Sequence, residues 1–191
     1  MRLFVAIVPP AGVLAELAAA VEPLQTAAPE LRWTNRSAWH LTLAFLGNVD
    51  EGVLPALTTR LERAARRHPA QSLAIEGGGA FPSPARARVV WAGIRADKPA
   101  LAALAASVAA GARRAGAAPA DEGRKYSPHL TLARCRQPAN VATLTAALTG
   151  FATAEWTAQS VHLVRSHLGG GAPRYEDVAE WPLLGRPHAG S

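Results

Sequence analysis

The sequence predicts an α+β protein in which helices pack on antiparallel or mixed β-sheets. Short runs of β-branched, aromatic and leucine residues alternate with alanine-rich segments that carry leucine at helical spacing. The order of strand, helix, strands and helix occurs twice along the chain. Because no linker divides the two halves, we expect residues 1–191 to form a single domain of two intertwined lobes.

The first half of the chain carries the signals of five elements. The opening apolar run ends at Pro9-Pro10, and the fourth element is stopped by Gly47-Asn48. Pro23 lies inside the first helical pattern and favours its early end. The expected elements are a strand at Leu3–Val8, a helix at Gly12–Ala27, strands at Leu31–Thr34 and His40–Leu46, and a helix from Asp50 or Glu51 to about His68.

The second half repeats this cadence and adds two closing strands. Its first strand leads into Gly77-Gly78-Gly79, where we expect that strand to end. The expected elements are strands at Ser72–Glu76, Arg88–Ile94 and His129–Ala133, helices at Lys98–Ala115 and Asn140–Leu148, and strands at Ala158–Leu168 and Arg174–Trp181. A polar loop is expected at Asp121–Pro128, and the tail Gly185–Ser191 is expected to fray.

The charge balance indicates a class of partner. The formal charge is +6, from 20 Lys and Arg against 14 Asp and Glu. An excess of arginine suits a phosphate-bearing or polyanionic partner such as RNA. A solvated arginine-rich surface would give the same balance, so the charge alone does not decide between them.

The cysteine count and the apolar runs indicate the compartment. The single cysteine, Cys135, excludes an internal disulfide framework and a cysteine-based zinc cluster. A reducing cytoplasm is the expectation that follows. The apolar run Leu3–Val8 is too short for a signal peptide, and no run approaches the roughly 20 residues of a membrane span. We therefore expect neither export nor a membrane partner.

The most informative feature is a repeated pentapeptide. His40-Leu41-Thr42-Leu43-Ala44 recurs unchanged as His129-Leu130-Thr131-Leu132-Ala133. The rest of the two halves repeats only in the order of its elements. A pentapeptide preserved inside diverged halves indicates duplication or a strong local constraint.

The geometry of a strand gives this repeat its meaning. Residues i and i+2 share one face, so each motif presents a histidine and a threonine about 7 Å apart on the same side. The leucines between them point to the other side and anchor each strand. If the two strands lie together about a pseudo-twofold axis, the side chains of His40, Thr42, His129 and Thr131 converge on one cleft.

Such a set of side chains suits phosphodiester chemistry. One histidine can take a proton from the attacking water while the other gives a proton to the leaving oxygen. Histidine suits both roles because its ordinary pKa lies near neutrality. The threonine hydroxyls can orient the phosphate oxygens. This chemistry requires no metal.

A zinc site is the main alternative use of the two histidines. It needs three or four protein ligands, whereas both motifs read His-x-Thr. The other histidines stand in no recognised ligand spacing; they are His68, His162, His167 and His188. We therefore expect no metal and no other cofactor.

Around these motifs the chain resembles a known family. Trp39–Gly47 and Ser127–Arg134 resemble the doubled motif of the RNA 2′,3′-cyclic phosphodiesterases, also called 2′-5′ RNA ligases, of the 2H phosphoesterase superfamily. Further segments that are similar to this family lie at Leu3–Ile7, Phe81-Pro82, Arg88–Gly93, Val164–Leu168 and Tyr175. The resemblance spans nearly the whole chain.

The resemblance implies a fold, an activity and residue roles. The fold is the bilobal 2H phosphoesterase fold, with two pseudo-symmetric lobes and a central cleft. The activity is hydrolysis of an RNA-terminal 2′,3′-cyclic phosphate to a 2′-phosphomonoester without a metal, with 2′-5′ RNA ligation as the reverse reaction. Its partners are RNA ends, tRNA fragments among them. His40 is the implied proton donor and His129 the acceptor, with exchange of the two roles left open, and Thr42 and Thr131 bind phosphate.

The same resemblance implies that Arg134 contacts the phosphate, and strict strand alternation contradicts it. Alternation from His129 places Ala133 and Cys135 on the cleft face and Arg134 on the opposite face. Arg134 can reach the phosphate only if the strand ends or bulges there, or if its long side chain curls round an edge. A surface position is the alternative.

Phe45 and Trp33 are candidates for stacking the terminal base of an RNA. Phe45 is out of register with His40, which favours a place in the core. For Trp33 the sequence leaves both readings open.

Three hypotheses of function remain. The first is the RNA-end cyclic phosphodiesterase, acting as a monomer. The second keeps the chemistry and changes the substrate to a small cyclic nucleotide, a 2′-5′ oligonucleotide or an ADP-ribose cyclic phosphate. The third is a non-catalytic RNA-binding module, against which the intact histidines and threonines argue.

Overall fold

The computed structural model describes residues 1–120, 123–167, 169 and 173–186. Two antiparallel sheets form its centre, with strand orders β3-β1-β8-β9 and β2-β6-β5-β4-β7. The strands are β1 (Arg2–Ile7), β2 (Arg32–Trp33), β3 (Leu41–Asn48), β4 (Gln71–Phe81), β5 (Ala87–Ala96), β6 (His129–Ala139), β7 (Trp156–Ala158), β8 (Ser160–His167) and β9 (Arg174–Pro182). The helices are α1 (Ala11–Ala27), α2 (Leu54–Ala65), α3 (Lys98–Arg114) and α4 (Ala142–Ala147).

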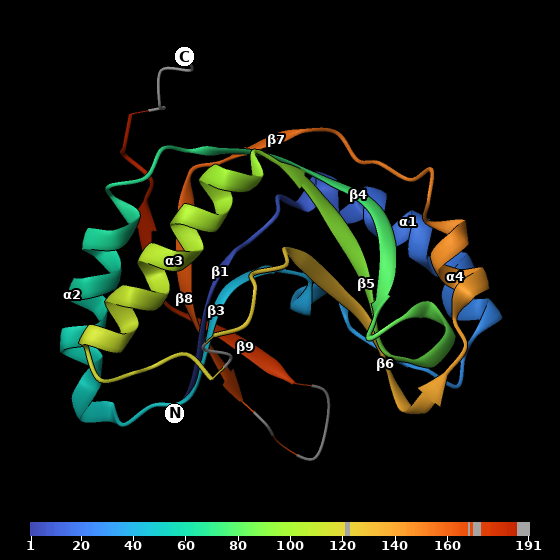
Figure 1. Cartoon of the computed structure of the whole chain (residues 1–191), viewed down its shortest axis with the longest axis horizontal. Helices are drawn as coiled ribbons and strands as arrows, with labels where there is room; N and C mark the ends of the chain where they lie inside the picture. Colours follow the sequence, from blue (N-terminus) through green and yellow to red (C-terminus); the bar gives the residue numbers. More distant parts are fainter. Residues whose placement is uncertain (121–122, 168, 170–172, 187–191) are drawn as a thin grey trace.

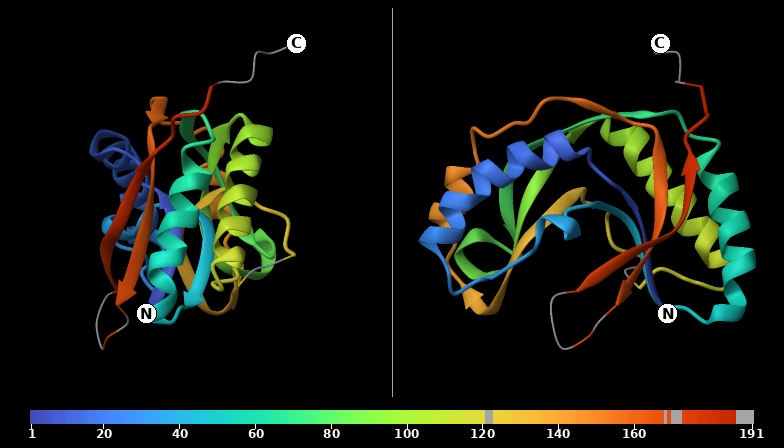
Figure 2. Two further views of the ribbon diagram at one scale, coloured as in Figure 1. Left: turned by 90° about the vertical axis from the view of Figure 1, so that its left-hand side faces the viewer. Right: turned by 180° about the vertical axis from the view of Figure 1, so that it is seen from behind.

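The helices lie on the outer sides of the two sheets in two pairs (Figures 1 and 2). α2 and α3 pack on each other and against the four-stranded sheet, where they contact β9 and β3. α1 and α4 lie beside the five-stranded sheet, where α4 contacts β4. This arrangement confirms the predicted α+β class with outer helices.

The chain passes repeatedly from one sheet to the other. β1 belongs to the four-stranded sheet, yet the helix that follows it, α1, lies beside the five-stranded sheet. Conversely β5 belongs to the five-stranded sheet, and the helix that follows it, α3, contacts β3 of the other sheet. Each half of the structure is therefore built from segments of both halves of the sequence (Figure 2).

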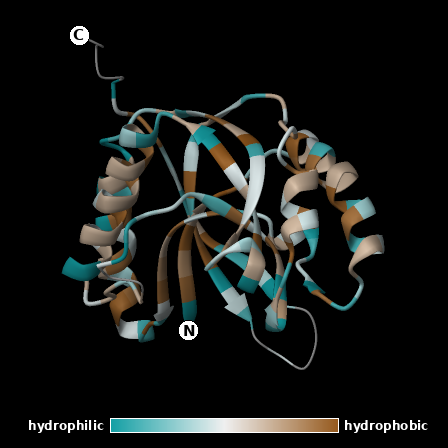
Figure 3. Ribbon diagram, turned by 45° about the vertical axis from the view of Figure 1, so that its right-hand side comes forward, coloured by the Kyte–Doolittle hydropathy of each residue, from teal (hydrophilic) through white to brown (hydrophobic). Residues whose placement is uncertain are grey.

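The main core lies between the helices and the outer faces of the sheets. Its largest fully buried side chains are leucines and isoleucines from both sheets and three helices, among them Leu17, Leu57, Leu101, Ile75 and Leu130. Burial of each such side chain stabilises the fold by about 1.5–3 kcal/mol. Hydrophobic residues accordingly line the strands between the two helix pairs (Figure 3).

A second, smaller apolar cluster lies on the other face of the four-stranded sheet. It consists of Phe4, Ala6 and Val164, with Phe45 and Tyr175 packed against them. Because alternate residues of a strand face opposite sides, Phe4 and Ala6 of β1 point away from the main core. The inner face of this sheet thus carries aromatic rings.

The triglycine segment does not end its strand as predicted. β4 continues from Gln71 through the glycines to Phe81, with a register shift between Ile75 and Gly78 where it pairs with β5. Gly77 adopts a positive φ of 66°, which glycine allows without steric cost. A β-bulge therefore carries the strand past a sequence that reads as a loop.

Other boundaries differ for local reasons. α1 continues through Pro23 to Ala27, so the predicted end of this helix is confirmed and the signal of Pro23 for an earlier end is wrong. The predicted strand over 158–168 is two strands, because the chain leaves the five-stranded sheet at Ala158 and enters the four-stranded sheet at Ser160. Predictions for residues 121–122, 168, 170–172 and 187–191 lie outside the described residues. None of the helices in the described ranges is long and apolar enough to span a membrane.

Candidate active site

The two copies of the pentapeptide lie on neighbouring strands of different sheets. His40 stands immediately before β3, and His129 is the first residue of β6. Cα atoms of β3 and β6 approach within 8 Å. In both copies the leucines are buried and the threonines half-buried, as strand alternation predicts.

A β-bulge interrupts the first copy. Val5 of β1 pairs with Ala44 and the next residue, Ala6, pairs with Thr42, so that Leu43 has no partner of its own. Two residues of β3 thus oppose one position of β1. Leu43 and Ala44 are both buried, and the alternation of faces restarts after them.

The second copy has a bulge at the equivalent place. Val90 of β5 pairs with Ala133, and Trp91 pairs with Thr131, so that Leu132 is left over. Leu132 and Ala133 are both fully buried. The pentapeptide therefore corresponds to one local backbone shape, repeated in two sheets.

The second bulge reverses the predicted orientation of three residues. Arg134 returns to the face of Thr131 and His129, and its charge acts on the His129 ring. Ala133 is fully buried, and Cys135 packs against the main core, where burial and the carboxylate of Glu30 raise the pKa of its thiol. The expectation that Ala133 and Cys135 face the cleft is wrong, because strict alternation ignores the bulge.

The first bulge likewise brings Phe45 to the inner face, so the register argument for a place in the main core is wrong. Its ring lies parallel to that of Phe4, with centroids 6.3 Å apart. The guanidinium of Arg2 lies 4.9 Å from the centroid of Phe45. Phe45 thus belongs to the small cluster that lines the inner side of the four-stranded sheet.

Trp33 lies elsewhere. It pairs with Ala133, whereas its neighbour Arg32 pairs with Arg134. Directly paired residues share a face of the sheet, so Trp33 points to the core side. Its ring packs against the main core, and its indole N–H donates to the carbonyl oxygen of Ala28 at 2.8 Å. The structure does not bring Trp33 to the site.

His40 is enclosed by aromatic rings. It stacks on Phe4 with centroids 4.7 Å apart, and the ring of Tyr175 meets it edge-on at 5.0 Å. Beside it lies a pocket of about 260 Å³, lined in part by Arg36, Tyr175 and Asp177. Burial lowers the pKa of His40 to about 4, and the Asp177 carboxylate partly offsets this effect.

His129 has a fixed tautomer. Its Nδ1 lies 2.8 Å from the carbonyl oxygen of Ser127. A carbonyl oxygen only accepts, so Nδ1 carries a proton and the lone pair of the neutral ring is at Nε2. Burial lowers the pKa of His129; the hydrogen bond to Ser127 raises it, and the positive charge of Arg134 lowers it again. The ring of Phe81 meets His129 edge-on at 5.0 Å.

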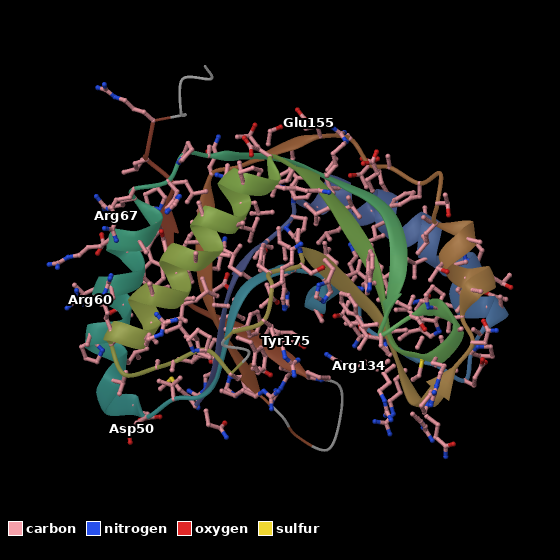
Figure 4. The ribbon with its side chains drawn as sticks, viewed as in Figure 1. Asp50, Arg60, Arg67, Arg134, Glu155 and Tyr175 are labelled. Carbon is pink, nitrogen blue, oxygen red and sulfur yellow. The ribbon has the colours of Figure 1, made fainter. Side chains whose placement is uncertain are left out.

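The positive charge of Arg134, in the five-stranded sheet, acts on Tyr175 of the four-stranded sheet. Figure 4 shows Arg134 of β6 and Tyr175 of β9 in the space between the sheets. Burial raises the pKa of Tyr175, while the positive charges of Arg134 and Arg2 lower it. Positive charge from both sheets thus acts on one region, as binding of a phosphate requires.

The segment before the second motif is anchored to the strand of the first. The hydroxyl of Tyr126 donates to the carbonyl oxygen of Thr42 at 3.3 Å, and the backbone N–H of Ala120 donates to that of Phe45 at 2.7 Å. Burial raises the pKa of Tyr126, which keeps its hydroxyl protonated as a donor. These bonds hold the chain that leads into His129 along the edge of β3.

Sequence reasoning missed several residues around the histidines. They are the rings of Phe4, Phe81 and Trp91, the edge of Tyr175 and the carboxylate of Asp177. Phe81 and Trp91 lie on the face of the site because Trp91 pairs with Thr131, and Val89, two residues before Trp91, pairs with Phe81. No local pattern indicates that β9 brings Tyr175 to His40.

The alternative of a zinc site finds no set of ligands in the part of the chain that the structure describes. No three His, Cys, Asp or Glu side chains gather there as metal ligands.

Known proteins resemble this chain over most of its length. Residues 13–170 match the model of the 2′-5′ RNA ligase superfamily. The RNA 2′,3′-cyclic phosphodiesterase of Methanothermobacter thermautotrophicus is 28% identical over 186 residues, which cover 96% of this chain and 99% of the relative. That of Geobacillus stearothermophilus is 30% identical over 165 residues, which cover 83% of this chain and 50% of the relative.

The fold is also similar to a solved structure. The protein TT0787 of Thermus thermophilus superposes with a TM-score of 0.78 at 29% identity, covering 98% of this chain and 100% of TT0787. The chain spans half the length of the Geobacillus relative and nearly all of the Methanothermobacter relative. The resemblance inferred from the paired motifs is thereby confirmed, and the chain belongs to the 2′-5′ RNA ligase superfamily.

Proposed function

We propose that this protein is an enzyme that hydrolyses an RNA-terminal 2′,3′-cyclic phosphate to a 2′-phosphomonoester. The observation that carries the proposal is the pair of His-x-Thr strands, β3 and β6, which approach each other from different sheets with opposite charges beside their histidines. Relatives that bear the name RNA 2′,3′-cyclic phosphodiesterase support the substrate. The proposal includes 2′-5′ RNA ligation at the same site, in which the 5′-hydroxyl of a second RNA takes the place of water, bonds to phosphorus and displaces the ribose 3′ oxygen.

His129 is the proton acceptor. With Nδ1–H bound to Ser127, the lone pair at Nε2 is available for the attacking water. Arg134 disfavours the imidazolium, so the ring is kept neutral, as a base must be before it reacts. The water oxygen bonds to phosphorus while its proton passes to Nε2.

His40 is the proton donor. The bond from phosphorus to the ribose 3′ oxygen breaks, and that oxygen takes a proton from the His40 ring, leaving the phosphate on the 2′ oxygen. Burial alone disfavours a charged His40, but the Asp177 carboxylate beside it favours the imidazolium. A bound phosphate would add its own negative charge and raise the His40 pKa further.

The remaining groups bind the substrate. Thr42 and Thr131, on the same strand faces as the histidines, supply hydroxyl donors for the non-bridging oxygens. Arg134 supplies a guanidinium whose fork matches two of these oxygens. Phe45, with Arg2 on its ring, offers a surface on which a base can stack. Because two imidazoles move the protons, the proposed steps require no metal.

The proposed partner is an RNA end, with tRNA fragments included, and the proposed setting is a monomer in the cytoplasm. The net charge of +6 supports a polyanionic RNA over a small cyclic nucleotide, which carries fewer phosphate charges. Small cyclic nucleotides and 2′-5′ oligonucleotides are the alternative substrates for the same site.

The test is an assay of a short RNA that ends in a 2′,3′-cyclic phosphate, in excess chelator, with identification of the product. We expect a 2′-phosphate, formed by the wild type and lost in His40→Ala and His129→Ala. His167→Ala is the matched control, since His167 is bound to Glu176 at 2.8 Å on the exposed hairpin. Turnover that returns only with a divalent metal, or RNA binding without turnover, would overturn the proposal.

A further inference from the structure

A carboxylate from β9 reaches the pocket of His40. Tyr175 and Asp177 lie two residues apart on one face of β9, opposite Ser166 and Val164 of β8. Tyr175 meets the His40 ring edge-on, and Asp177 lines the same pocket. A residue far along the chain thus brings a negative charge to the histidine of the first motif.

Asp177 is flanked by a largely buried histidine, His162. The Oδ2 atom of Asp177 lies 3.4 Å from Nδ1 of His162, a nitrogen that is buried and makes no hydrogen bond among the described residues. The side chain of His162 is 14% exposed, against 60% for Asp177. The carboxylate therefore has one side on His162 and the other open to the pocket.

A second acidic residue, Glu180, lies on the other side of His162. Ser160 Oγ donates to Glu180 Oε1 at 2.6 Å and lies 3.4 Å from Nε2 of His162. Glu180 Oε1 is itself 3.8 Å from that nitrogen. His162 thus stands between two carboxylates of β9, and one of them, Asp177, lines the pocket of His40.

We propose that Asp177, held by His162, is a positioning residue that makes His40 the proton donor of the pair. The proposal rests on the proposed function and deepens it. A carboxylate beside an imidazole favours the imidazolium, which is the form that can give a proton. The other motif has the opposite neighbour, because Arg134 lies beside His129. Two copies of one pentapeptide thereby take different roles.

The other groups around His40 do not supply this charge. Phe4 of β1 and Val164 of β8 are apolar. Tyr175 has a raised pKa and is neutral. Arg36 lines the pocket, but its charge has the opposite sign. Its guanidinium donates to the carbonyl oxygen of Ala11. Asp177 is the carboxylate that acts on His40. Substrate that fills the pocket would displace water and strengthen this interaction.

The test variant removes the negative charge of Asp177 and keeps the shape of its side chain. We expect Asp177→Asn to lower kcat for the cyclic phosphate about tenfold near neutral pH, the effect of about one pKa unit in the donor, and to change KM much less. The alkaline limb of kcat should move to lower pH, because a donor with a lower pKa loses its proton earlier. Glu176→Gln is the matched control: it removes the same charge from the neighbouring residue, whose carboxylate binds His167 instead.

A change of leaving group separates this role from a structural one. In a cyclic substrate with sulfur in place of the bridging 3′ oxygen, the thiolate leaves without needing a proton. The defect of Asp177→Asn should vanish on this substrate. The variant His162→Ala should show a smaller defect of the same kind, and the double variant should be no slower than Asp177→Asn, because His162 acts through Asp177.

Four outcomes would overturn the proposal. Wild-type kcat in Asp177→Asn, or an equal loss on the oxygen and sulfur substrates, would overturn it alone. A loss of equal size in Glu176→Gln would reduce the effect to net charge and also overturn it. A wild-type protein with no turnover of the cyclic phosphate would overturn the proposed function, and this proposal with it.

Discussion

Phe45 and Arg134 occupy equivalent positions, each five residues after the histidine of its pentapeptide and each returned to the inner face by a β-bulge. In the four-stranded sheet the position holds an aromatic ring packed on Phe4, and in the five-stranded sheet a cation beside His129. The repeat thus gives the two lobes one backbone shape and two different groups. In the proposed function, Phe45 stacks on a base of the RNA and Arg134 binds its phosphate.

Replacement of Arg134 should reduce activity strongly. We expect Arg134→Ala to lower kcat/KM on the order of 10- to 100-fold, since a hydrogen bond to a charged group contributes about 1.5–3 kcal/mol. Arg134→Lys should restore only part of the loss, because an ammonium lacks the planar fork. Arg66→Ala is the control, as Arg66 pairs with Glu62 on the outer helix α2. Equal effects of Arg134→Ala and Arg66→Ala would contradict the assignment.

Phe45 and Trp33 should differ in their effects on substrate binding. Phe45→Ala should raise KM about tenfold or more for the cyclic RNA, since stacking of a base on an aromatic ring contributes about 1–3 kcal/mol. Trp33→Phe keeps an apolar ring on the core side and loses only the bond to Ala28, so kcat and KM should stay unchanged. Steady-state kinetics of both variants decide this. A rise in KM confined to Trp33→Phe would reverse the structural assignment.

The sequence was sufficient for the fold class, the paired strands and the buried leucines, because each depends on local alternation or on an identical repeat. It was insufficient where one extra residue enters a strand. The bulges at Leu43 and Leu132 leave no trace in the pattern of hydrophobic residues, since Leu and Ala suit the core in either register. The orientation of Phe45 and Arg134 could not be derived without them.

Contacts between segments far apart in the sequence could not be predicted either. Tyr175 and Asp177 come to His40 only through the pairing of β9 with β8 and of β8 with β1. No sequence pattern near Tyr175 and Asp177 predicts that they lie close to the first motif. Polar residues on an exposed hairpin read as surface until the sheet is assembled.

The space at Gly79 should be required for the site of His129. A Cβ atom there would overlap the Cζ2 atom of Trp91, so the indole must move. Overpacking of this kind costs about 1–3 kcal/mol, and we expect Gly79→Ala to lose that much stability in urea unfolding and to lower activity. Gly12→Ala, with nothing within 4 Å of its Cβ, is the control: inside helix α1 it should not lower stability, and activity should stay unchanged. Retained stability in Gly79→Ala would show that Trp91 does not pack there.

The pH optimum of kcat/KM should lie below pH 6.5. This constant reports the free enzyme, in which the pKa of His40 is about 4 and that of His129 is below its ordinary 6.5. Both limbs of the bell should therefore lie below pH 6.5. In the complex the negative phosphate raises both pKa values, so the profile of kcat should be displaced to higher pH. An alkaline limb of kcat/KM above pH 7 would contradict the buried state of His40.

The burial of His40 should also make stability depend on pH. Above pH 6.5 the ring is neutral in both the folded and unfolded chains, so no proton is exchanged. As the pH falls from 6.5 towards about 4, the unfolded chain binds a proton at this position and the folded chain does not, so the free energy of unfolding decreases. Between pH 6.5 and 4.5 the decrease should be about 2 kcal/mol from this one group.

The variant His40→Asn isolates that contribution. It removes the titrating ring and leaves every other acidic and basic group in place, so the shared effects of the carboxylates and of His129 cancel in the comparison. We expect the variant to lose less stability than the wild type between pH 6.5 and 4.5, whatever its stability at neutral pH. Urea unfolding of both proteins at a series of pH values gives the two slopes. Parallel curves would mean that the His40 ring takes a proton as readily in the fold as outside it, and the pocket would then be wetter than its lining of aromatic rings implies.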